Sequence, residues 1–359
     1  MGGFRLGSVL GFEIRIDYSW FIIAFLILWS FSAGVFPQRY PGLDPNVYML
    51  MGTVGAILFF VSLLAHELSH SVVARRRGIP VEGITLFVFG GMAHTKSEAE
   101  NPADELVIAG VGPLCSIVIG FLFSALWWFG QQAGWPVSIT GVAGYLGFLN
   151  FLLAGFNLLP GFPLDGGRLF RALVWRATGD LTKATRWASN GGKVLGYLLI
   201  TLGFLQVLGG FVVGGLWLVF IGWFLRTAAA ASFQQHVLRN LMAGVTASDV
   251  MTPRPVAVTS HLSIRELVEQ RFLNDPYQGY PVVIGDSVVG VVTLDHARRV
   301  PRRAWAETSV ADVMIPAEAL TVEPDATLSE VLERMTASGT NRVLVTELGQ
   351  LVGLISASD

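Results

Sequence analysis

Residues 66–70 of the chain read His-Glu-Leu-Ser-His, and these residue types at this spacing are able to hold a metal ion and activate water. Residues four positions apart share one face of a helix, so His66 and His70 can bind the same metal while Glu67 reaches metal-bound water as a base. The pattern also arises by chance on exposed helices. Here it follows the uncharged apolar run 47–65, and ionisable residues at membrane depth are costly and generally functional. We therefore predict a zinc-dependent hydrolytic site.

A catalytic zinc site needs a third protein ligand and an open position for water. The metzincin pattern would place Gly at position 73 and His at position 76, but the chain has Val73 and Arg76, so that class is excluded. A carboxylate from a distant segment must then complete the site. Asp165 is the candidate because it is the only acidic residue between Glu105 and Asp180.

The elements that must position these residues are membrane helices. Only 14% of the 359 residues are charged and 52% are hydrophobic, whereas about a quarter of the residues of a soluble domain are charged. The net charge of −2 argues against a nucleic-acid partner, and the single Cys115 excludes an intrachain disulfide. Residues 1–232 hold 14 Lys/Arg and 11 Asp/Glu, and residues 233–359 hold 10 and 15. We place a boundary between a membrane part and a soluble part near Phe233.

Long uncharged runs in the first part predict the membrane spans. A span takes about 20 apolar residues, and four of the five runs fit one span each. The last run has 32 residues, too long for a single span, so we expect two spans that break near Gly209-Gly210. The prediction is six spans in all, drawn from the runs 18–36, 47–65, 106–130, 141–164 and 194–225.

The charges of the connecting segments predict the orientation of the spans. Arg75–Arg77 follow the second span and five cations in 168–186 follow the fourth, whereas the 131–140 loop has no Lys or Arg. The positive-inside rule then places both termini in the cytoplasm. Asp165, which directly follows the fourth run, returns to the same membrane edge as the two histidines. The alternative for Asp-Gly-Gly at 165–167 is a simple turn.

The soluble part contains an internal repeat. Residues 248–251 (Ser-Asp-Val-Met) recur as 311–314 (Ala-Asp-Val-Met), and 290–293 (Gly-Val-Val-Thr) recur as 353–356 (Gly-Leu-Ile-Ser), each pair 63 positions apart. Such a period indicates two copies of one small α/β unit. The repeat resembles paired CBS domains.

In CBS domains a Thr or Ser followed three residues later by Asp contacts the ribose of an adenosine nucleotide. The second copy keeps this pattern as Ser356 and Asp359, and the first copy departs from it with Thr293 and His296. The resemblance implies ATP or AMP as a regulator; the alternative is a purely structural or dimerising pair. The chain stops at Asp359, before the helix that should follow, so we expect the second copy to be truncated.

The whole constellation resembles the site-2 protease family of intramembrane metalloproteases, in the prokaryotic branch that carries CBS domains and includes the sporulation factor IVFB protease. The motifs are residues 66–70 and the segment Asn157…Pro160…Leu164–Arg168. The resemblance implies that His66, His70 and Asp165 bind one Zn²⁺ and that Glu67 is the catalytic acid and base. It also implies that Asn157 holds the substrate backbone or the oxyanion; packing between helices is the alternative.

Residues 79–95 are too short for a span, and they combine β-forming residues with turn glycines. Similar proteins have a membrane-embedded β-hairpin or sheet here, whose free edge would add a strand from an unwound substrate. Gly90 and Gly91 would let the substrate approach closely, or would merely turn the chain. His94 is a further candidate, with an ordinary loop histidine as the alternative.

The expected protein is therefore a polytopic α-helical membrane enzyme with about six transmembrane helices, a membrane-embedded β-hairpin and a C-terminal α/β tandem CBS domain. The expected domains are a membrane metalloprotease at 1–232, a linker at 233–244 and a CBS pair at 245–359, with copies at about 245–305 and 308–359. By resemblance it hydrolyses transmembrane substrates near the cytoplasmic face of the plasma membrane, and nucleotide binding to the CBS pair gates this activity.

The resemblance implies single-span substrates such as anti-sigma factors, membrane-tethered transcription factors or signal-peptide remnants, and homodimerisation through the CBS domains. Two other classes stay open. A CBS-regulated divalent-ion channel or transporter would use the same four residues as an ion site, although no inverted repeat is visible across the spans. An inactive membrane receptor is disfavoured because no motif residue is replaced.

Overall fold

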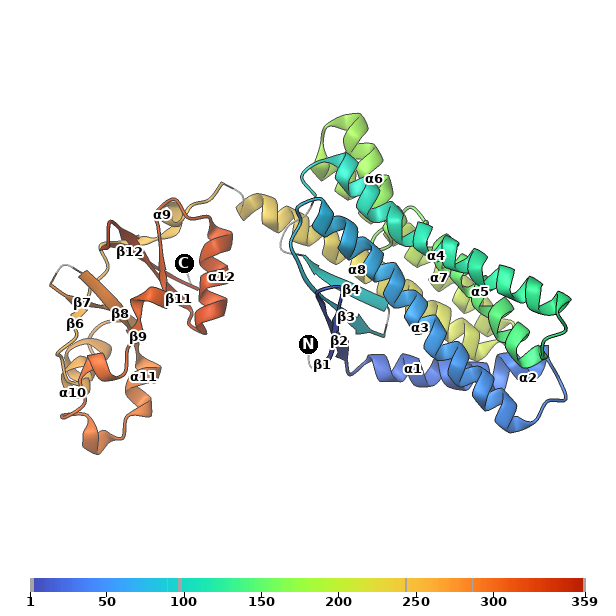
Figure 1. The fold of residues 1–359 in the computed structure, drawn as a ribbon. Coiled ribbons are helices and arrows are strands. Elements are labelled where there is room, and N and C mark those ends of the chain that lie inside the picture. Colours follow the sequence, from blue (N-terminus) through green and yellow to red (C-terminus); the bar gives the residue numbers. More distant parts are fainter. Residues whose placement is uncertain (1–2, 89, 96–98, 243, 286, 358–359) are drawn as a thin grey trace. The chain divides into compact units, whose positions relative to one another are not determined.

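The computed structural model describes residues 3–88, 90–95, 99–242, 244–285 and 287–357 (Figure 1). By internal packing the chain divides into two units, Met1–His236 and Val237–Asp359. Each unit has its own sheet, and we describe each by itself.

Six helices among the described residues are long and apolar enough to cross a membrane, which confirms the six expected spans of a multi-pass membrane protein. The first is built of α1 (Trp20–Trp29), a π-helical segment (Ser30–Val35) and α2 (Phe36–Arg39). The fifth and sixth are separated at residues 209–211, where Gly210 takes a left-handed φ of 89°. The remaining five are α3 (Pro45–Arg76), α4 (Pro102–Gln132), α5 (Val137–Asn157), α7 (Leu181–Leu208) and α8 (Val212–Met242).

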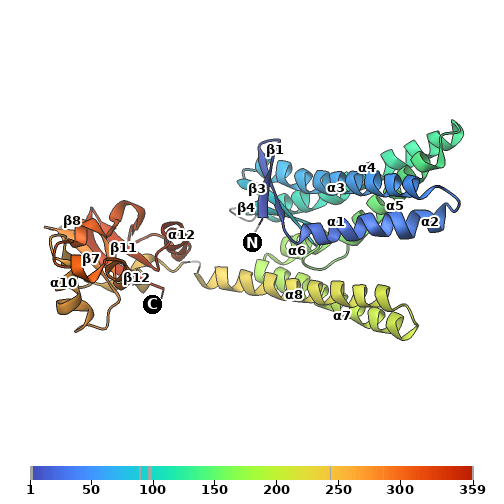
Figure 2. The ribbon, with the colours of Figure 1, turned by 90° about the horizontal axis from the view of Figure 1, so that it is seen from below.

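The helices α3 and α4 of the first unit pack side by side (Figure 2). The carboxylate of Asp44 caps α3 by accepting the Asn46 N–H at 2.8 Å, and the Asn101 side chain caps α4 by accepting the Asp104 N–H at 2.9 Å. Such caps satisfy backbone donors that a helix start leaves without a partner. Both helices therefore have defined starting points, which helps to set their relative register.

A further helix, α6 (Asp165–Thr178), was not predicted from the sequence. It begins at Asp165, directly after the turn that ends α5, and it ends at Gly179, whose φ of 71° is typical of a helix C-terminus. Its apolar and polar residues fall on opposite faces, and Ala172 and Arg171 are buried. The first turn of α6 places the carboxylate of Asp165 next to α3.

The first unit also contains a four-stranded sheet in the order β1-β2-β3-β4. The predicted hairpin of 79–95 is present as β3 (Val81–Phe87) and β4 (Gly90–Thr95). The sequence analysis did not expect β1 (Gly3–Val9) and β2 (Phe12–Asp17), which join the hairpin through a parallel pairing of β2 with β3. Ile14, Ile84 and Leu86 are buried against Leu64 and Leu68 of α3, so the sheet packs beside the His-Glu-Leu-Ser-His segment with β4 at its edge.

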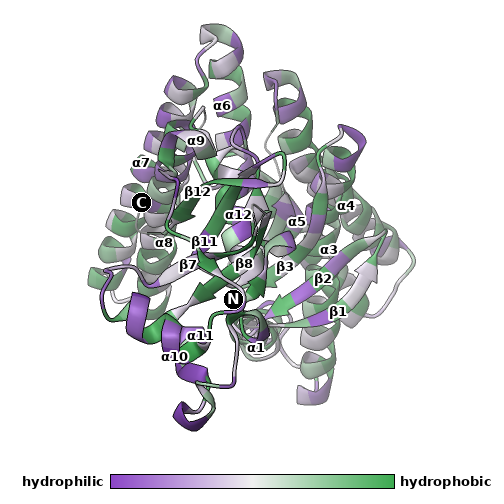
Figure 3. Ribbon diagram, turned by 90° about the vertical axis from the view of Figure 1, so that its left-hand side faces the viewer, coloured by the Kyte–Doolittle hydropathy of each residue, from purple (hydrophilic) through white to green (hydrophobic). Residues whose placement is uncertain are grey.

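The second unit contains an eight-stranded sheet in which the predicted repeat is visible. The two copies contribute equivalent hairpins, β7–β8 and β11–β12, and they exchange short strands: β5 of the first copy pairs with β12, and β9 of the second with β8. Figure 3 shows hydrophobic colour on β11 and β12. The strands are β5 (Thr252–Pro253), β6 (Val258–Thr259), β7 (Gly279–Ile284), β8 (Ser287–Thr293), β9 (Ile315–Pro316), β10 (Thr321–Val322), β11 (Arg342–Glu347) and β12 (Gln350–Ser356).

Helices flank this sheet at matching points of the two copies. The first copy has α10 (Ile264–Leu267) followed by a π-helical turn (Val268–Phe272), and the second copy has α12 (Leu328–Ser338) at the matching point. The helices α9 (Ala247–Val250) and α11 (Leu294–Arg299) complete the first copy. The alternation of helix and strand in both copies agrees with the α/β repeat inferred from the sequence.

Candidate metal centre and active site

His66 and His70 of α3 and Asp165 of α6 come together in the first unit. The Nε2 atoms of His66 and His70 lie 3.1 and 3.2 Å from the same oxygen, Oδ2 of Asp165, and 3.3 Å from each other. Both imidazoles are buried, with 2% and 7% of their surface exposed. Within the described ranges these three residues are the one group of His, Cys, Asp or Glu side chains found with suitable spacing for a metal ion.

The hydrogen bonds at the far side of each imidazole determine which nitrogen faces the cluster as an acceptor. Nδ1 of His70 lies 2.6 Å from the backbone carbonyl of Ile108, and a carbonyl only accepts, so Nδ1 carries the proton. Nδ1 of His66 lies 2.9 Å from the hydroxyl of Ser116, which accepts the Nδ1–H when Nε2 of His66 is the unprotonated nitrogen. In the neutral imidazoles both Nε2 atoms then present lone pairs toward Asp165.

This donor set fits Zn²⁺. Three atoms that bear lone pairs, two nitrogens and one carboxylate oxygen, lie within 3.3 Å of each other, an arrangement that is repulsive unless a cation lies among them. Tetrahedral Zn²⁺, with bonds of about 2.0–2.2 Å, separates its ligand atoms by roughly 3.3 Å. Two imidazoles and one carboxylate also form a ligand set of catalytic zinc sites, which keep one position open.

The helix α4 packs against the two imidazoles through residues that were not predicted from the sequence. Ile108 and Ser116 lie on α4, and Gly112 lies between them along the chain. A Cβ atom at Gly112 would stand 2.1 Å from Nε2 of His70 and 2.7 Å from Nε2 of His66. Only glycine leaves the space between the imidazoles and α4 open.

Glu67 lies next to the cluster on α3 and faces the sheet. The backbone of Gly91 on β4 hydrogen bonds with its carboxyl group. A Cβ atom at Gly91 would stand 2.5 Å from Cγ of Glu67. The structure therefore brings Gly91 against Glu67, and the close approach of β4 requires glycine there.

The turn between α5 and α6 presents Asp165 to the histidines. The Phe162 N–H donates to the Ala188 carbonyl of α7 at 3.1 Å, and the Leu164 N–H donates to the Gly161 carbonyl at 3.1 Å. Gly167 packs so closely on the backbone of Gly161 that a Cβ would stand 2.3 Å from its carbonyl carbon. The glycines after Asp165 thus let α6 start tightly against the turn.

Burial of the Asp165 carboxyl raises its pKa, but the neighbouring imidazoles have the larger combined effect. When the His66 and His70 rings are protonated, their hydrogen bonds and their positive charge hold the pKa of Asp165 below its ordinary value. The carboxylate is therefore ionised at neutral pH and available as a ligand.

The other residues predicted for this site have simpler surroundings. Asn157 ends α5, and its Nδ2 donates to the Leu153 carbonyl of the same helix at 3.1 Å. Gly90 opens β4 with a left-handed φ of 135°, and a Cβ there would meet no atom within 4 Å, so it serves the turn. His94 is exposed on β4 and pairs with Thr85 through Nε2 at 2.8 Å.

The residues predicted for nucleotide binding lie in the second unit. Thr293 caps α11: its hydroxyl accepts the His296 N–H at 3.4 Å, and its own N–H donates to Nδ1 of His296 at 3.3 Å. Ser356 ends β12. Asp359 lies outside the described residues.

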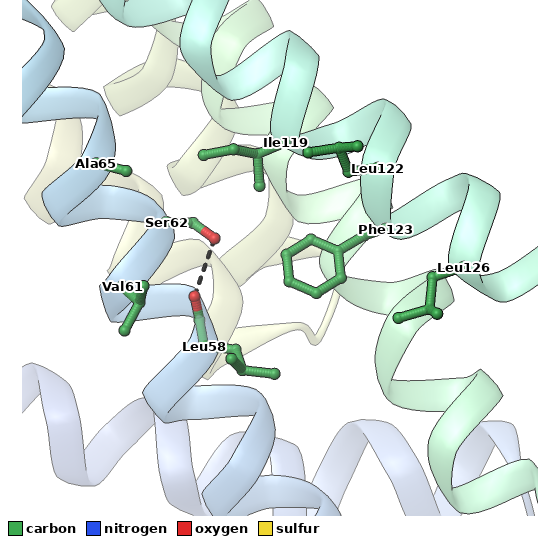
Figure 4. A pocket seen from close by; sticks show the side chains of 8 residues that line it. All are labelled: Leu58, Val61, Ser62, Ala65, Ile119, Leu122, Phe123 and Leu126. Atoms are coloured by element: carbon green, nitrogen blue, oxygen red, sulfur yellow. Dashed lines mark hydrogen bonds between the residues drawn. The ribbon is translucent and has the colours of Figure 1, made fainter.

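An apolar pocket of the first unit lies between α3 and α4 (Figure 4). It has a volume of about 410 Å³, and its one polar side chain, Ser62, donates to the Leu58 carbonyl at 2.9 Å. The described residues around it bear no titratable group, so it offers space for apolar groups but no chemistry of its own. Its lining consists of Leu58, Val61, Ser62, Ala65, Ile119, Leu122, Phe123 and Leu126.

Three features together define a multi-pass metallopeptidase. They are the six membrane helices, the edge strand beside a glutamate, and the group of two histidines and one carboxylate. Peptidase family M50 matches residues 54–140 and 130–202, and the CBS domain family matches 247–302 and 310–359. The chain belongs to peptidase family M50, as a zinc metalloprotease of the site-2 protease type with a C-terminal pair of CBS domains. The predicted family, enzyme class and fold class are confirmed.

Similar proteins come from bacteria and archaea. Rip3 of Mycobacterium tuberculosis, which is named as a zinc metalloprotease, is 39% identical over 99% of this chain and 91% of its own length. Zinc metalloprotease MJ0392 of Methanocaldococcus jannaschii is 31% identical over 99% of this chain and 94% of its own. Among solved structures, the site-2 protease from M. jannaschii is 28% identical, with a TM-score of 0.46 over 65% of this chain and 95% of that chain.

Proposed function

We propose that the chain hydrolyses peptide bonds within membrane-spanning segments, with His66, His70 and Asp165 as ligands of one Zn²⁺ and Glu67 as the acid and base. The observation that carries the proposal is the convergence of the two Nε2 atoms on one carboxylate oxygen, 3.1 and 3.2 Å away. A hydrolytic reaction agrees with membership of peptidase family M50.

Bound zinc would polarise the scissile carbonyl and lower the pKa of water. Glu67 would accept a proton during attack and return it to the departing amine. Ser116 and the Ile108 carbonyl keep the imidazoles oriented, because the carbonyl accepts the Nδ1–H of His70 and the Ser116 hydroxyl lies within hydrogen-bond distance of Nδ1 of His66. We propose that Asn157 holds the substrate backbone or the oxyanion after release of its amide from Leu153.

The position of β4 at the edge of the sheet supports a proposal for how the backbone of the substrate is held. A helical substrate has its backbone groups paired and must unwind before hydrolysis, and unwound backbone at membrane depth needs new partners. We propose that an extended stretch of substrate pairs with β4 and passes Gly90 and Gly91, beside the Glu67 carboxyl.

The first test compares a general-base variant with ligand variants of the full chain in detergent. Glu67→Gln is expected to lower cleavage of a single-span substrate by at least about 10²-fold and to keep zinc. His66→Ala, His70→Ala and Asp165→Ala are each expected to lose zinc, measured as metal per chain. Full cleavage by the purified Glu67→Gln variant would contradict the role of Glu67, and full zinc content in the ligand variants would contradict the metal site.

We further propose that the CBS pair binds an adenosine nucleotide and dimerises. We also propose that both termini and the CBS pair lie in the cytoplasm and that the site faces the cytoplasmic side of the plasma membrane. Arg75 and Arg76 at the end of α3 support this orientation under the positive-inside rule. Proteomics of peptides trapped by Glu67→Gln would separate anti-sigma factors, tethered transcription factors and signal-peptide remnants as substrates.

A further inference from the structure

A buried ion pair connects α4 with α6 inside the membrane unit. The Arg171 Nε donates to Oε1 of Glu105 at 2.6 Å, and Nη2 of the same guanidinium contacts that oxygen as well. Glu105 is fully buried, and 7% of Arg171 is exposed. The sequence analysis had counted Arg171 among the cations of a connecting loop, whereas the structure places it in the protein interior.

Burial of this kind is difficult to explain by stability alone. Two charges that leave water lose hydration that their mutual attraction only partly restores, so an apolar pair of similar size is often as stable. A buried pair does impose one geometry, because a lone buried charge is strongly unfavourable. The pair therefore restricts how α6 can sit on α4.

The two helices joined in this way are the ones that arrange the metal ligands. On α4, Glu105 lies one helical turn before Ile108, whose carbonyl orients His70. On α6, Arg171 lies six positions after Asp165, and the turn just before Asp165 contains Phe162, whose ring lies 5.2 Å from the Arg171 guanidinium carbon. The guanidinium thus contacts both the helix behind the histidines and the turn that presents the carboxylate.

We propose that Glu105 and Arg171 are positioning residues that set the Asp165 carboxylate at its distance from His66 and His70. The inference rests on the proposed zinc site, because it concerns the accuracy with which the third ligand is held. Neither residue touches the ligand atoms. Their effect is on zinc affinity, and through it on catalysis, by way of the α4–α6 contact.

Zinc affinity of the full chain, measured in detergent by competition with a chelator, tests the proposal. Glu105→Gln and Arg171→Lys are each expected to weaken zinc binding about 3- to 30-fold, the range found for residues that contact no ligand and act through the packing between elements. Arg171→Lys keeps the charge but loses the planar fork that holds Glu105 and covers Phe162. Because it keeps the buried charge, it is the variant expected to fold normally, and its zinc-free form should unfold in one cooperative transition a few degrees below that of the wild type.

A nearby ion pair supplies the control. Arg77 and Asp104 are 2.5 Å apart and partly exposed, with 43% and 21% of their side chains accessible. Asp104 directly precedes Glu105 on α4, but its pair with Arg77 joins α4 to the end of α3. Arg77→Gln is expected to leave zinc affinity within about twofold of the wild type, as exposed pairs contribute little.

Wild-type zinc affinity in both Glu105→Gln and Arg171→Lys would overturn the inference, and so would an equal loss in Arg77→Gln. Asp165→Ala separates this failure from a failure of the proposed function. Loss of zinc in Asp165→Ala together with normal affinity in the pair variants overturns only the positioning role. Retention of zinc in Asp165→Ala overturns the metal site itself.

Discussion

At the scale of single residues, Gly112 tests the metal centre most directly. A Cβ at this position would stand 2.1 Å from Nε2 of His70, so Gly112→Ala must displace an imidazole. We expect zinc affinity to fall by at least about tenfold, measured by chelator competition. Gly110→Ala on the same helix is the matched control, because its Cβ would meet only the Leu169 side chain, at 3.8 Å. Equal zinc affinity in the two variants would contradict the proposed location of the metal.

The residues of the site differ in how far the sequence could predict them. His66, Glu67 and His70 follow from helical spacing, which is local, and Asp165 follows from the alternation of membrane spans with loop charge. Ser116 and Gly112 lie in an uncharged run that predicts a helix but not which of its faces meets α3. That face depends on packing between distant segments, and no local pattern of residues records it.

At the scale of elements, the approach of β4 to α3 leads to a prediction for Gly91. A Cβ there would stand 2.5 Å from Cγ of Glu67, so Gly91→Ala should displace the base without touching the zinc ligands. We expect kcat to fall by up to about 100-fold while zinc content stays at one per chain. Gly155→Ala, whose Cβ would meet no atom within 4 Å, should keep both. Loss of zinc in Gly91→Ala would show that the strand supports the metal instead of the base.

Elements with a strong local signal were predicted, and elements that depend on distant partners were not. The five apolar runs, with the last one divided in two, became six long helices because length and hydropathy alone decide whether a segment suits the membrane. The strand β2 has buried apolar residues at alternate positions, Phe12, Ile14 and Ile16, a pattern that predicts a strand with one buried face. Its partner β3 lies more than 60 positions away in the sequence, so no local pattern of residues predicts that the two strands pair. The helix α6 was missed because its charges resemble those of a loop.

At the scale of the whole molecule, α7 and α8 connect the site with the start of the second unit. The Phe162 N–H in the turn before Asp165 donates to the Ala188 carbonyl of α7. The Ser189 hydroxyl, one residue further on, donates to the Ala229 carbonyl of α8 at 2.6 Å. The helix α8 then continues without a break to Met242. A displacement of α8 therefore has a packed route of a few contacts to the turn that presents the third ligand.

The nucleotide binding proposed for the CBS pair is expected at one of its two copies. In the first copy His296 stands where the family has Asp, and its Nδ1 accepts the Thr293 N–H. Burial lowers the pKa of the His296 imidazole, helped by Arg299, so the group is neutral near pH 7 and supplies no negative charge for ribose hydroxyls. The second copy retains Ser356 with Asp359. Calorimetry of the full chain with ATP is therefore expected to give one nucleotide per chain.

The two hydroxyl residues distinguish the copies within the same titration. Ser356→Ala should weaken ATP binding by about tenfold, the loss of a hydrogen bond to a bound group, whereas Thr293→Ala should leave the affinity unchanged. Two nucleotides per chain, or loss of binding in Thr293→Ala alone, would contradict the assignment. The cleavage rate then decides whether binding matters: if saturating ATP leaves the wild-type rate equal to that of nucleotide-free enzyme, the route through α8 carries no regulation and the CBS pair serves assembly alone.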